Sequence, residues 1–206
     1  MPSVRQIRFV YKPVVFALCL LPFAWICARA FELGSFSLGP NPIEDIQDEM
    51  GIWGLRLIML TLAVTPARHA LGKPWPLQFR RMLGLFAFFY ILMHFLTWLF
   101  LDQGLLLSAI AEDIVKRPFI TIGFAAFLIL IALTATSTSG ARRRLGRRWQ
   151  QLHNWVYIAA ILGVWHYWWQ VKLDASDPAI YAAILSALLG YRLWRRRRQS
   201  RGRTAA

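Results

Sequence analysis

Histidines have the clearest potential for chemistry in this sequence, and there are four of them: His69, His94, His153 and His166. All but His69 lie within long apolar stretches, where an ionisable ring is costly enough to indicate a function. Imidazole is a common axial ligand of haem iron, so three such rings with few acids nearby favour a metal or haem cofactor. The alternatives are a structural hydrogen bond to a neighbouring helix or a proton relay. His69 follows Arg68 and is expected to be a solvated loop residue.

Depth in the membrane predicts which histidines bind the same metal. His94 precedes Asp102 by eight residues and His166 precedes Asp174 by eight, and these acids are the first to follow the two apolar stretches. At a rise of 1.5 Å per residue, both rings should lie about 12 Å from the same end of the bundle. His153 lies near the opposite end of its stretch. We therefore expect His94 and His166 to be the two axial ligands of one haem iron, between two parallel helices.

His153 and three arginines are further candidates for cofactor binding. Thirteen residues separate His153 from His166, which places the rings about 140° apart around an ideal helix. His153 is expected to ligate a second cofactor, to orient a quinone or flavin, or to make a structural hydrogen bond. Arg56 lies within an apolar stretch and needs a haem propionate, a quinone oxygen or the membrane interface as its partner. Arg80 and Arg81 begin a helix, where they either contact cofactor carboxylates and phosphates or only orient the chain.

A haem is a large apolar disc, so its pocket needs aromatic side chains. The candidates near the two paired histidines are Phe88, Phe89, Phe95, Trp98, Trp165 and Trp168. The same residues could instead belong to the aromatic belt at the membrane interface, and we favour the belt for Trp168 and Trp169.

Composition indicates that helices in a membrane must position these residues. The 206 residues are 57% hydrophobic and 17% charged, which is unlike a soluble domain. Mostly apolar windows of about 17 to 22 residues recur, as bilayer-crossing helices require. The alternating pattern of barrel strands is absent, so we expect an all-α membrane protein, a six-transmembrane-helix bundle forming one domain over residues 1–206. The expected spans are residues 14–30, 51–66, 80–101, 118–136, 149–170 and 178–194.

The distribution of charge predicts the orientation of the bundle. Most of the 24 lysines and arginines fall in four blocks, at residues 5–12, 68–81, 142–148 and 192–203, and the ten acids fall at or beyond the opposite ends of the spans. By the positive-inside rule, the N- and C-termini are cytoplasmic. This spacing explains the net charge of +14 without nucleic acid as a partner, and the arginine-rich tail is expected to contact anionic lipid. The acidic outer loops either dock a partner by complementary charge or are simply solvated.

Several other kinds of site are not expected. The sequence contains no Gly-rich phosphate-binding loop, no CxxC pair and no serine-centred nucleophile motif, which argues against a nicotinamide-binding module. Cys19 and Cys27 both lie in the first span, in lipid, where no disulfide is expected. A signal peptide is the alternative for the basic segment 1–12 and the apolar run after it. Because no strong small-residue cleavage site follows, we expect this first span to be retained.

Five segments of the sequence resemble one family of membrane proteins. They are RRMLGLFAFFYILMH (80–94), KRPFITIG (116–123), LTATSTSG (133–140), LGRRWQQLHNWVYIAAILGVWHY (145–167) and DPAIYA (177–182). These segments are similar to the MsrQ family, formerly called YedZ, which comprises the haem-binding membrane subunits of bacterial MsrPQ methionine-sulfoxide reductase systems. The family belongs to the wider ferric-reductase-like transmembrane group, and the resemblance covers nearly the whole chain.

The resemblance implies a cytochrome b of the bacterial inner membrane that takes electrons from the quinone pool. It would pass them to a periplasmic molybdopterin enzyme, MsrP, which reduces methionine sulfoxide in oxidised proteins. The resemblance also implies haem b and FMN as cofactors and His94, His153 and His166 as functional histidines. The chain would be an electron-transfer subunit rather than a catalytic one. Members of the wider group often carry two histidines on each of spans three and five, whereas here Arg80 or a neighbour stands at the first position of span three.

Two other classes of function stay open at this point. A stand-alone ferric or flavin-linked transmembrane reductase would use the same haem and act on small substrates without a protein partner. A transporter or scaffold without redox chemistry would use the histidines for packing or proton relay, and the purified protein would then be colourless.

Overall fold

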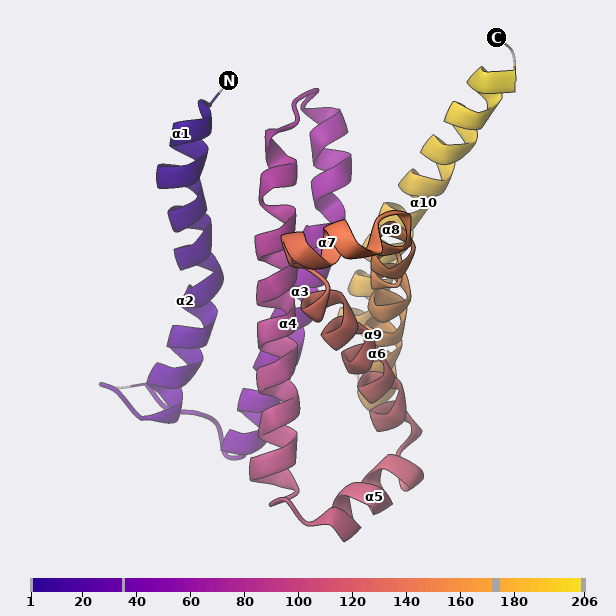
Figure 1. Ribbon diagram of the computed structural model, residues 1–206. Helices are drawn as coiled ribbons and strands as arrows, with labels where there is room; N and C mark the ends of the chain where they lie inside the picture. Colours follow the sequence, from indigo (N-terminus) through magenta and orange to yellow (C-terminus); the bar gives the residue numbers. More distant parts are fainter. Residues whose placement is uncertain (1, 35, 172–174, 205–206) are drawn as a thin grey trace.

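Helices make up all the regular structure of the described part of the chain, residues 2–34, 36–171 and 175–204 of a computed structural model (Figure 1). The all-α class is therefore confirmed. Asp174, which set the expected depth of His166, lies outside the described residues. In chain order the helices are α1 (Val4–Gln6), the π-helix η1 (Ile7–Tyr11), α2 (Lys12–Ala30), α3 (Pro42–Ala70), the 3-10 helix η2 (Trp75–Gln78), α4 (Arg80–Thr97), the π-helix η3 (Trp98–Asp102), α5 (Leu107–Lys116), α6 (Pro118–Ala135), α7 (Ser139–Leu145), α8 (Arg147–His153), α9 (Val156–Gln170) and α10 (Ser176–Thr204).

Four helical segments among the described residues are long and apolar enough to cross a membrane. They coincide with the first four expected spans and comprise Val4–Ala30, Pro42–Ala70, Arg80–Asp102 and Pro118–Ala135. The positions of the fifth and sixth expected spans are occupied by α8 with α9 and by α10.

The second span is much longer than expected from the apolar run 51–66. α3 begins at Pro42, and Glu44 and Asp45 lie in its first turn. Proline at a helix start and acids near the positive end of the helix dipole both stabilise this terminus. The acids that were expected in a loop therefore form helical turns. At the other end α3 continues past Pro66, so His69 lies in its last turn rather than in a loop, and the expectation for His69 was wrong.

The fifth span is divided, contrary to the expected continuous helix over 149–170. α8 ends at His153 and α9 begins at Val156, with a turn at Asn154 and Trp155 between them. The backbone N–H of Trp155 bonds to the carbonyl of Leu152 at 3.0 Å, a tighter pairing than in an α-helix. The connections before and after α6 also contain helices that the sequence did not suggest, since α5 lies within 102–117 and α7 lies crosswise to the long helices (Figure 1).

Two helical hairpins form the centre of the molecule. α3 packs most extensively against α4, and α6 packs most extensively against α9. α2 lies on one flank, against α3 and α4, whereas α10 lies against α9 and α3. Both chain ends and the turn between α3 and α4 lie at one end of the molecule, and α5 lies at the opposite end (Figure 1). We call the end that carries α5 the α5 end.

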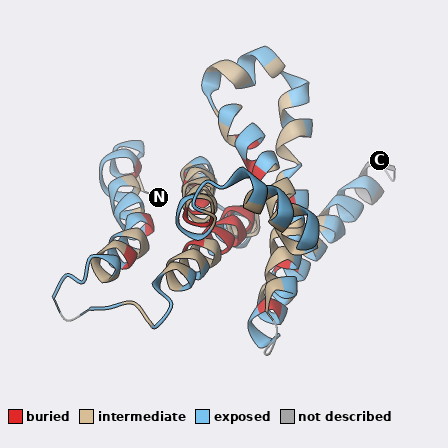
Figure 2. Ribbon diagram, turned by 90° about the horizontal axis from the view of Figure 1, so that it is seen from below, coloured by how far each residue is buried: buried red, intermediate tan, exposed pale blue. Residues whose placement is uncertain are grey.

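Buried residues gather on the central helices (Figure 2). Leu62 of α3 and Tyr90 of α4 are fully buried members of one core, and Ala159 and Ala160 of α9 are almost fully buried in it. Small residues at such contacts let helices approach closely, which increases the van der Waals packing that favours helix association in lipid. Exposed apolar side chains occupy the outward faces, as expected where lipid replaces water.

The hydrogen bonding of α2 is irregular next to Pro22, where Tyr90 pairs with two backbone groups of the helix. The Tyr90 hydroxyl accepts from the backbone N–H of Phe23 at 2.9 Å and donates to the carbonyl of Cys19 at 2.8 Å. In a regular helix these two backbone groups would bond to each other. The hydroxyl is therefore inserted into the helix one residue after the proline. Tyr90 is fully buried, so this contact joins α2 to the central hairpin.

Pro66 creates a similar gap in α3, which Arg192 of α10 fills. Proline lacks an N–H, so the carbonyl of Leu62 has no helical donor. The Nη2 atom of Arg192 donates to that carbonyl at 2.9 Å, and its Nη1 donates to the Tyr157 hydroxyl at 2.6 Å. Arg192 was expected to belong to the lipid-contacting basic tail. It instead links α10 to α3 and α9.

Replacing Tyr90 with Phe should destabilise the bundle. Without the hydroxyl, the Phe23 N–H and the Cys19 carbonyl lose their partners, at a cost of about 1–3 kcal/mol. Thermal unfolding in detergent, followed by circular dichroism, should show a lower midpoint than for the wild type. Tyr11→Phe is the matched control because Tyr11 is exposed. Equal midpoints for the two variants would contradict this role of Tyr90.

Candidate metal centre

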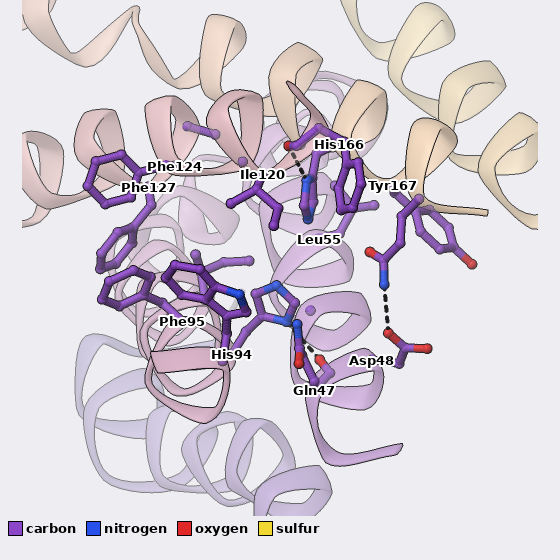
Figure 3. Close-up of a pocket in the computed structure, with 18 of the residues that line it drawn as sticks. Gln47, Asp48, Leu55, His94, Phe95, Ile120, Phe124, Phe127, His166 and Tyr167 are labelled. Carbon is purple, nitrogen blue, oxygen red and sulfur yellow. Dashed lines mark hydrogen bonds between the residues drawn. The ribbon is translucent and has the colours of Figure 1, made fainter. Parts of the chain in front are cut away.

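A cavity of about 480 Å³ lies between the two hairpins, towards the α5 end. This volume is within the range of about 300–1,000 Å³ that is usual for small-molecule and cofactor sites. α3, α4, α6 and α9 all contribute to its walls, and His94 and His166 project into it from opposite sides (Figure 3). The expected convergence of these two histidines is therefore present in the structure.

The separation of the two imidazoles suits one metal ion between them. Their ring centres are 6.1 Å apart and their planes are inclined at 81°. Imidazole–metal bonds are about 2.0–2.1 Å long, so two such bonds plus the short distance from each nitrogen to its ring centre come to about the observed separation. Among the described residues, no group of three or more His, Cys, Asp or Glu side chains could hold a metal ion. The two imidazoles therefore offer two candidate ligands, the number that an iron held by a macrocycle can take from the protein.

Backbone carbonyls orient both rings. The Nδ1 atom of His94 lies 2.7 Å from the carbonyl oxygen of Gln47, and that of His166 lies 2.7 Å from the carbonyl oxygen of Phe119 (Figure 3). A carbonyl can only accept, so each Nδ1 carries the proton and donates. In a neutral imidazole the other nitrogen, Nε2, is then free to bind a metal. Such a bond from the second nitrogen is the usual way in which proteins fix a ligating histidine.

Two glycines make these bonds possible. A Cβ atom on Gly51 would lie 3.0 Å from Nδ1 of His94, and one on Gly123 would lie 2.8 Å from Nδ1 of His166. Any larger residue would displace the ring that passes over it. Each glycine lies four residues after the carbonyl that its histidine contacts, at Gln47 and Phe119. One turn of helix thus provides both the acceptor and the space.

The two halves of the site are built alike, and equivalent residues differ by a constant residue number. Gln47, Gly51 and His94 correspond to Phe119, Gly123 and His166, and each pair differs by 72 in residue number. The hairpins α3–α4 and α6–α9 therefore place their histidines in equivalent ways. The glycines and carbonyls were missed from the sequence. The shared offset of the glycines and histidines was the one signal that could have revealed them.

Aromatic side chains line the wall beside the histidines. Phe95 and Phe127 stack with ring centres 4.7 Å apart, and Phe124 lies 5.9 Å from Phe95 (Figure 3). Phe95 and Trp98 were expected here, whereas the two residues from α6 were not. Trp165 is half exposed and is not among the residues that line the cavity, and the same is true of Trp168, which agrees with the belt position favoured for it.

His153 lies in a second cavity of about 340 Å³, together with Arg80 and Arg81. Its Nε2 atom lies 3.1 Å from the Thr136 hydroxyl, and its ring stacks on Trp149 with ring centres 4.0 Å apart. The structure thus brings together three sequence candidates that had been considered separately. It also places polar residues of α7 and its N-cap in the same wall, namely Thr138, Ser139 and Arg142, which the sequence did not single out.

Arg56 lies outside the walls of both cavities. Its Nε donates to the Tyr181 hydroxyl at 2.9 Å, and its guanidinium lies 4.7 Å from the centre of the Trp53 ring. The partner that this arginine needs is therefore supplied by α10 and by its own helix. A cation over an indole ring contributes about 0.5–1 kcal/mol at an exposed site.

Apolar helical spans and two half-buried histidines facing one cavity between two hairpins are typical of a membrane protein that binds a cofactor within its helical bundle. Residues 50–164 match the family described as ferric reductase like transmembrane component. The chain is 46% identical to the protein-methionine-sulfoxide reductase heme-binding subunit MsrQ of Xanthomonas axonopodis pv. citri (strain 306), over 90% of this chain and 86% of that protein. It is 47% identical to the MsrQ subunit of Ralstonia nicotianae, over 93% of this chain and 87% of that protein.

The chain therefore belongs to the MsrQ family of ferric-reductase-like membrane proteins. This confirms the resemblance seen in the sequence motifs. It also confirms a multi-pass protein of the bacterial inner membrane.

Proposed function

We propose that this chain is the haem-binding electron-transfer subunit of a methionine-sulfoxide reductase system. It would take electrons from the membrane quinone pool and pass them to a periplasmic molybdopterin-dependent reductase of the MsrP kind. The observation that carries the proposal is the pair His94 and His166, whose ring centres lie 6.1 Å apart across a cavity in the bundle. The heme-binding name of the curated relatives supports it.

The residues of the cavity fit a haem b. His94 and His166 present two neutral imidazoles, and Phe95, Phe124 and Phe127 provide an apolar wall. When bound, the haem would supply a centre that accepts and releases one electron at a time. The Nδ1–H bonds to the carbonyls of Gln47 and Phe119 would hold His94 and His166 in place as ligands of the haem iron. Ligand identity, hydrogen bonding and burial are the factors that set the potential of such a centre.

The proposed orientation places six spans across the membrane in one domain, with both termini in the cytoplasm. α8 with α9 and α10 would be the fifth and sixth spans. Support comes from Figure 1, where both chain ends lie at the same end as the turn between α3 and α4, which carries Lys73. The basic tail of α10 lies at that end too, where it would contact anionic lipid.

The second cavity is the proposed site of electron uptake. Arg80, Arg81 and Arg142 give it a cationic wall, and His153 adds a polar ring nitrogen. Guanidinium groups bind carboxylate and phosphate oxygens well, so a quinone or the phosphate of FMN would find suitable partners here. Arg56 would serve this path only indirectly, because Tyr181 already engages it.

The partner reductase is proposed to dock at the α5 end, where the histidine cavity opens. The acids of this end mostly have partners within the chain. Arg29 pairs with Glu49, and Arg117 lies 3.3 Å from Asp113. Charge complementarity is therefore only one contribution to docking, and the shape of the α5 end is another.

Alanine at His94 or at His166 should abolish the low-spin haem signal. Each change removes one axial ligand from an iron that needs two. The absorbance and electron paramagnetic resonance spectra of the purified protein, with its iron-to-protein ratio, measure this. His69→Ala is the control because His69 lies outside both cavities. A wild-type spectrum in either test variant would rule out the pairing.

Alanine at Gly123 should weaken haem binding without removing any ligand. Its Cβ atom would approach Nδ1 of His166 to 2.8 Å, so the ring must leave its rotamer at a cost of about 0.5–1.5 kcal/mol. Haem affinity should fall by about 2- to 10-fold, and Gly51→Ala should have a smaller effect. Gly190→Ala is the control, since a Cβ there meets no atom within 4 Å. Equal haem affinity in all three variants would show that the glycines do not position the rings.

Alanine at His153 should leave the His94 and His166 haem spectrum intact and slow its reduction by a quinol analogue. The change removes a polar contact only in the second cavity. Stopped-flow absorbance in detergent or nanodiscs measures the rate, and His69→Ala, at the same end of the molecule, is the control. Unchanged kinetics would exclude His153 from electron uptake.

A further inference from the structure

Trp98 has a buried indole N–H without an acceptor. The residue is 8% exposed, and its Nε1 atom has no hydrogen-bond partner within the described part of the chain. A buried polar group without a partner costs about 1–3 kcal/mol on the evidence of protein mutants. Trp98 lines the histidine cavity. The indole N–H is therefore free to donate a hydrogen bond to a molecule that binds in this cavity.

The position of Trp98 relates it directly to the haem ligand His94. Its backbone N–H bonds to the carbonyl of His94, so the two residues are one helical turn apart on α4. Phe95 lies against the indole with ring centres 5.8 Å apart and restricts its movement. Trp98 begins η3, whose wider π-helical turns often occur at functional sites. From His94, it lies towards the α5 end.

The cavity is polar at the α5 end and apolar towards its centre. Asn41, Asp48, Asp102 and Arg117 line the polar part, while Ile58, Leu130 and Ala159 line the apolar part. A haem is similarly divided, since it carries two carboxylates on one edge and hydrocarbon on the other. Its carboxylates therefore match the α5 end, where Trp98 lies.

The acidic side chains at this end cannot donate hydrogen bonds to such carboxylates, and they already have partners in the protein. The carboxylate of Asp48 accepts from Gln170 at 3.1 Å, and that of Asp102 accepts from Gln103 at 2.9 Å. Arg117 is ion-paired with Asp113. A carboxylate that enters the cavity can therefore accept from the N–H of Trp98, which has no acceptor among the described residues and can only donate.

We propose that Nε1 of Trp98 donates a hydrogen bond to a propionate of the haem held by His94 and His166. The inference rests on the proposed function and adds a residue that orients the haem, with its propionates towards the α5 end. The bond draws negative charge away from the region of the iron. It therefore raises the reduction potential relative to that of a haem without this bond.

Trp98→Phe tests the proposal because it keeps an aromatic ring beside Phe95 and removes the N–H. A redox titration should give a lower midpoint potential than in the wild type, and the propionate bending band in resonance Raman spectra should shift. The bis-imidazole electron paramagnetic resonance signal should persist. Trp165→Phe is the control, since Trp165 is half exposed and lies outside the cavity. It should leave both the potential and the band unchanged.

An unchanged or raised potential in Trp98→Phe, with the bis-imidazole signal intact, would overturn the inference while leaving the proposed function standing. Absence of that signal from the wild type would instead contradict the proposed function. The wild type offers a second test that does not depend on the stability of the variant. Loading the haem-free protein with haem should shift the hydrogen-bond-sensitive indole band in ultraviolet resonance Raman spectra. Loading with haem dimethyl ester should shift it less, because a neutral ester carbonyl is a weaker acceptor than a carboxylate. Equal indole bands for both haems would also refute the bond.

Discussion

The hydrogen bond from each imidazole to a helix carbonyl is the interaction on which the rest of this structure depends. The bond at Gln47 determines the tautomer and direction of His94, and the bond at Phe119 does the same for His166. Each bond forms only if the ring lies directly on a neighbouring helix, which requires a glycine one turn further on. The close packing of α3 on α4 and of α6 on α9 is thus a condition of the site as well as a source of stability.

The same constraint explains the two proline-containing helices. A bilayer offers no water to a freed carbonyl, so a neighbouring helix must supply a donor. Tyr90 does this for Cys19, and Arg192 does it for Leu62. In each case one polar side chain ties an outer helix, α2 or α10, to the central hairpins. The same contacts therefore satisfy the hydrogen-bonding groups of the backbone and hold the helices together.

These contacts also mark the limit of what the sequence could predict. The helical class and the pairing of His94 with His166 follow from apolar length and from depth, because both depend on spacing along one helix. The carbonyl acceptors carry no side-chain signal, and the role of Arg192 was hidden within a run of arginines. The turn at Asn154 was missed because no proline or glycine lies next to it in the expected span 149–170. Tertiary contacts between helices decide such details, and periodicity within a single helix does not report them.

The offset of 72 residues further accounts for the difference between the two cavities. Applied to His153, it leads to Arg81, since 153 minus 72 is 81, and both residues line the second cavity. At the equivalent positions, one cavity therefore receives an imidazole from each hairpin. The other receives the imidazole of His153 and the guanidinium of Arg81, and Arg80 and Arg142 add further positive charge to its wall. Two neutral imidazoles bring no charge and suit a metal whose charge is balanced by a macrocycle. A guanidinium is always charged, so the second cavity favours an electron-rich or anionic donor. Equivalent hairpins can thus provide two chemically different ends for one electron path.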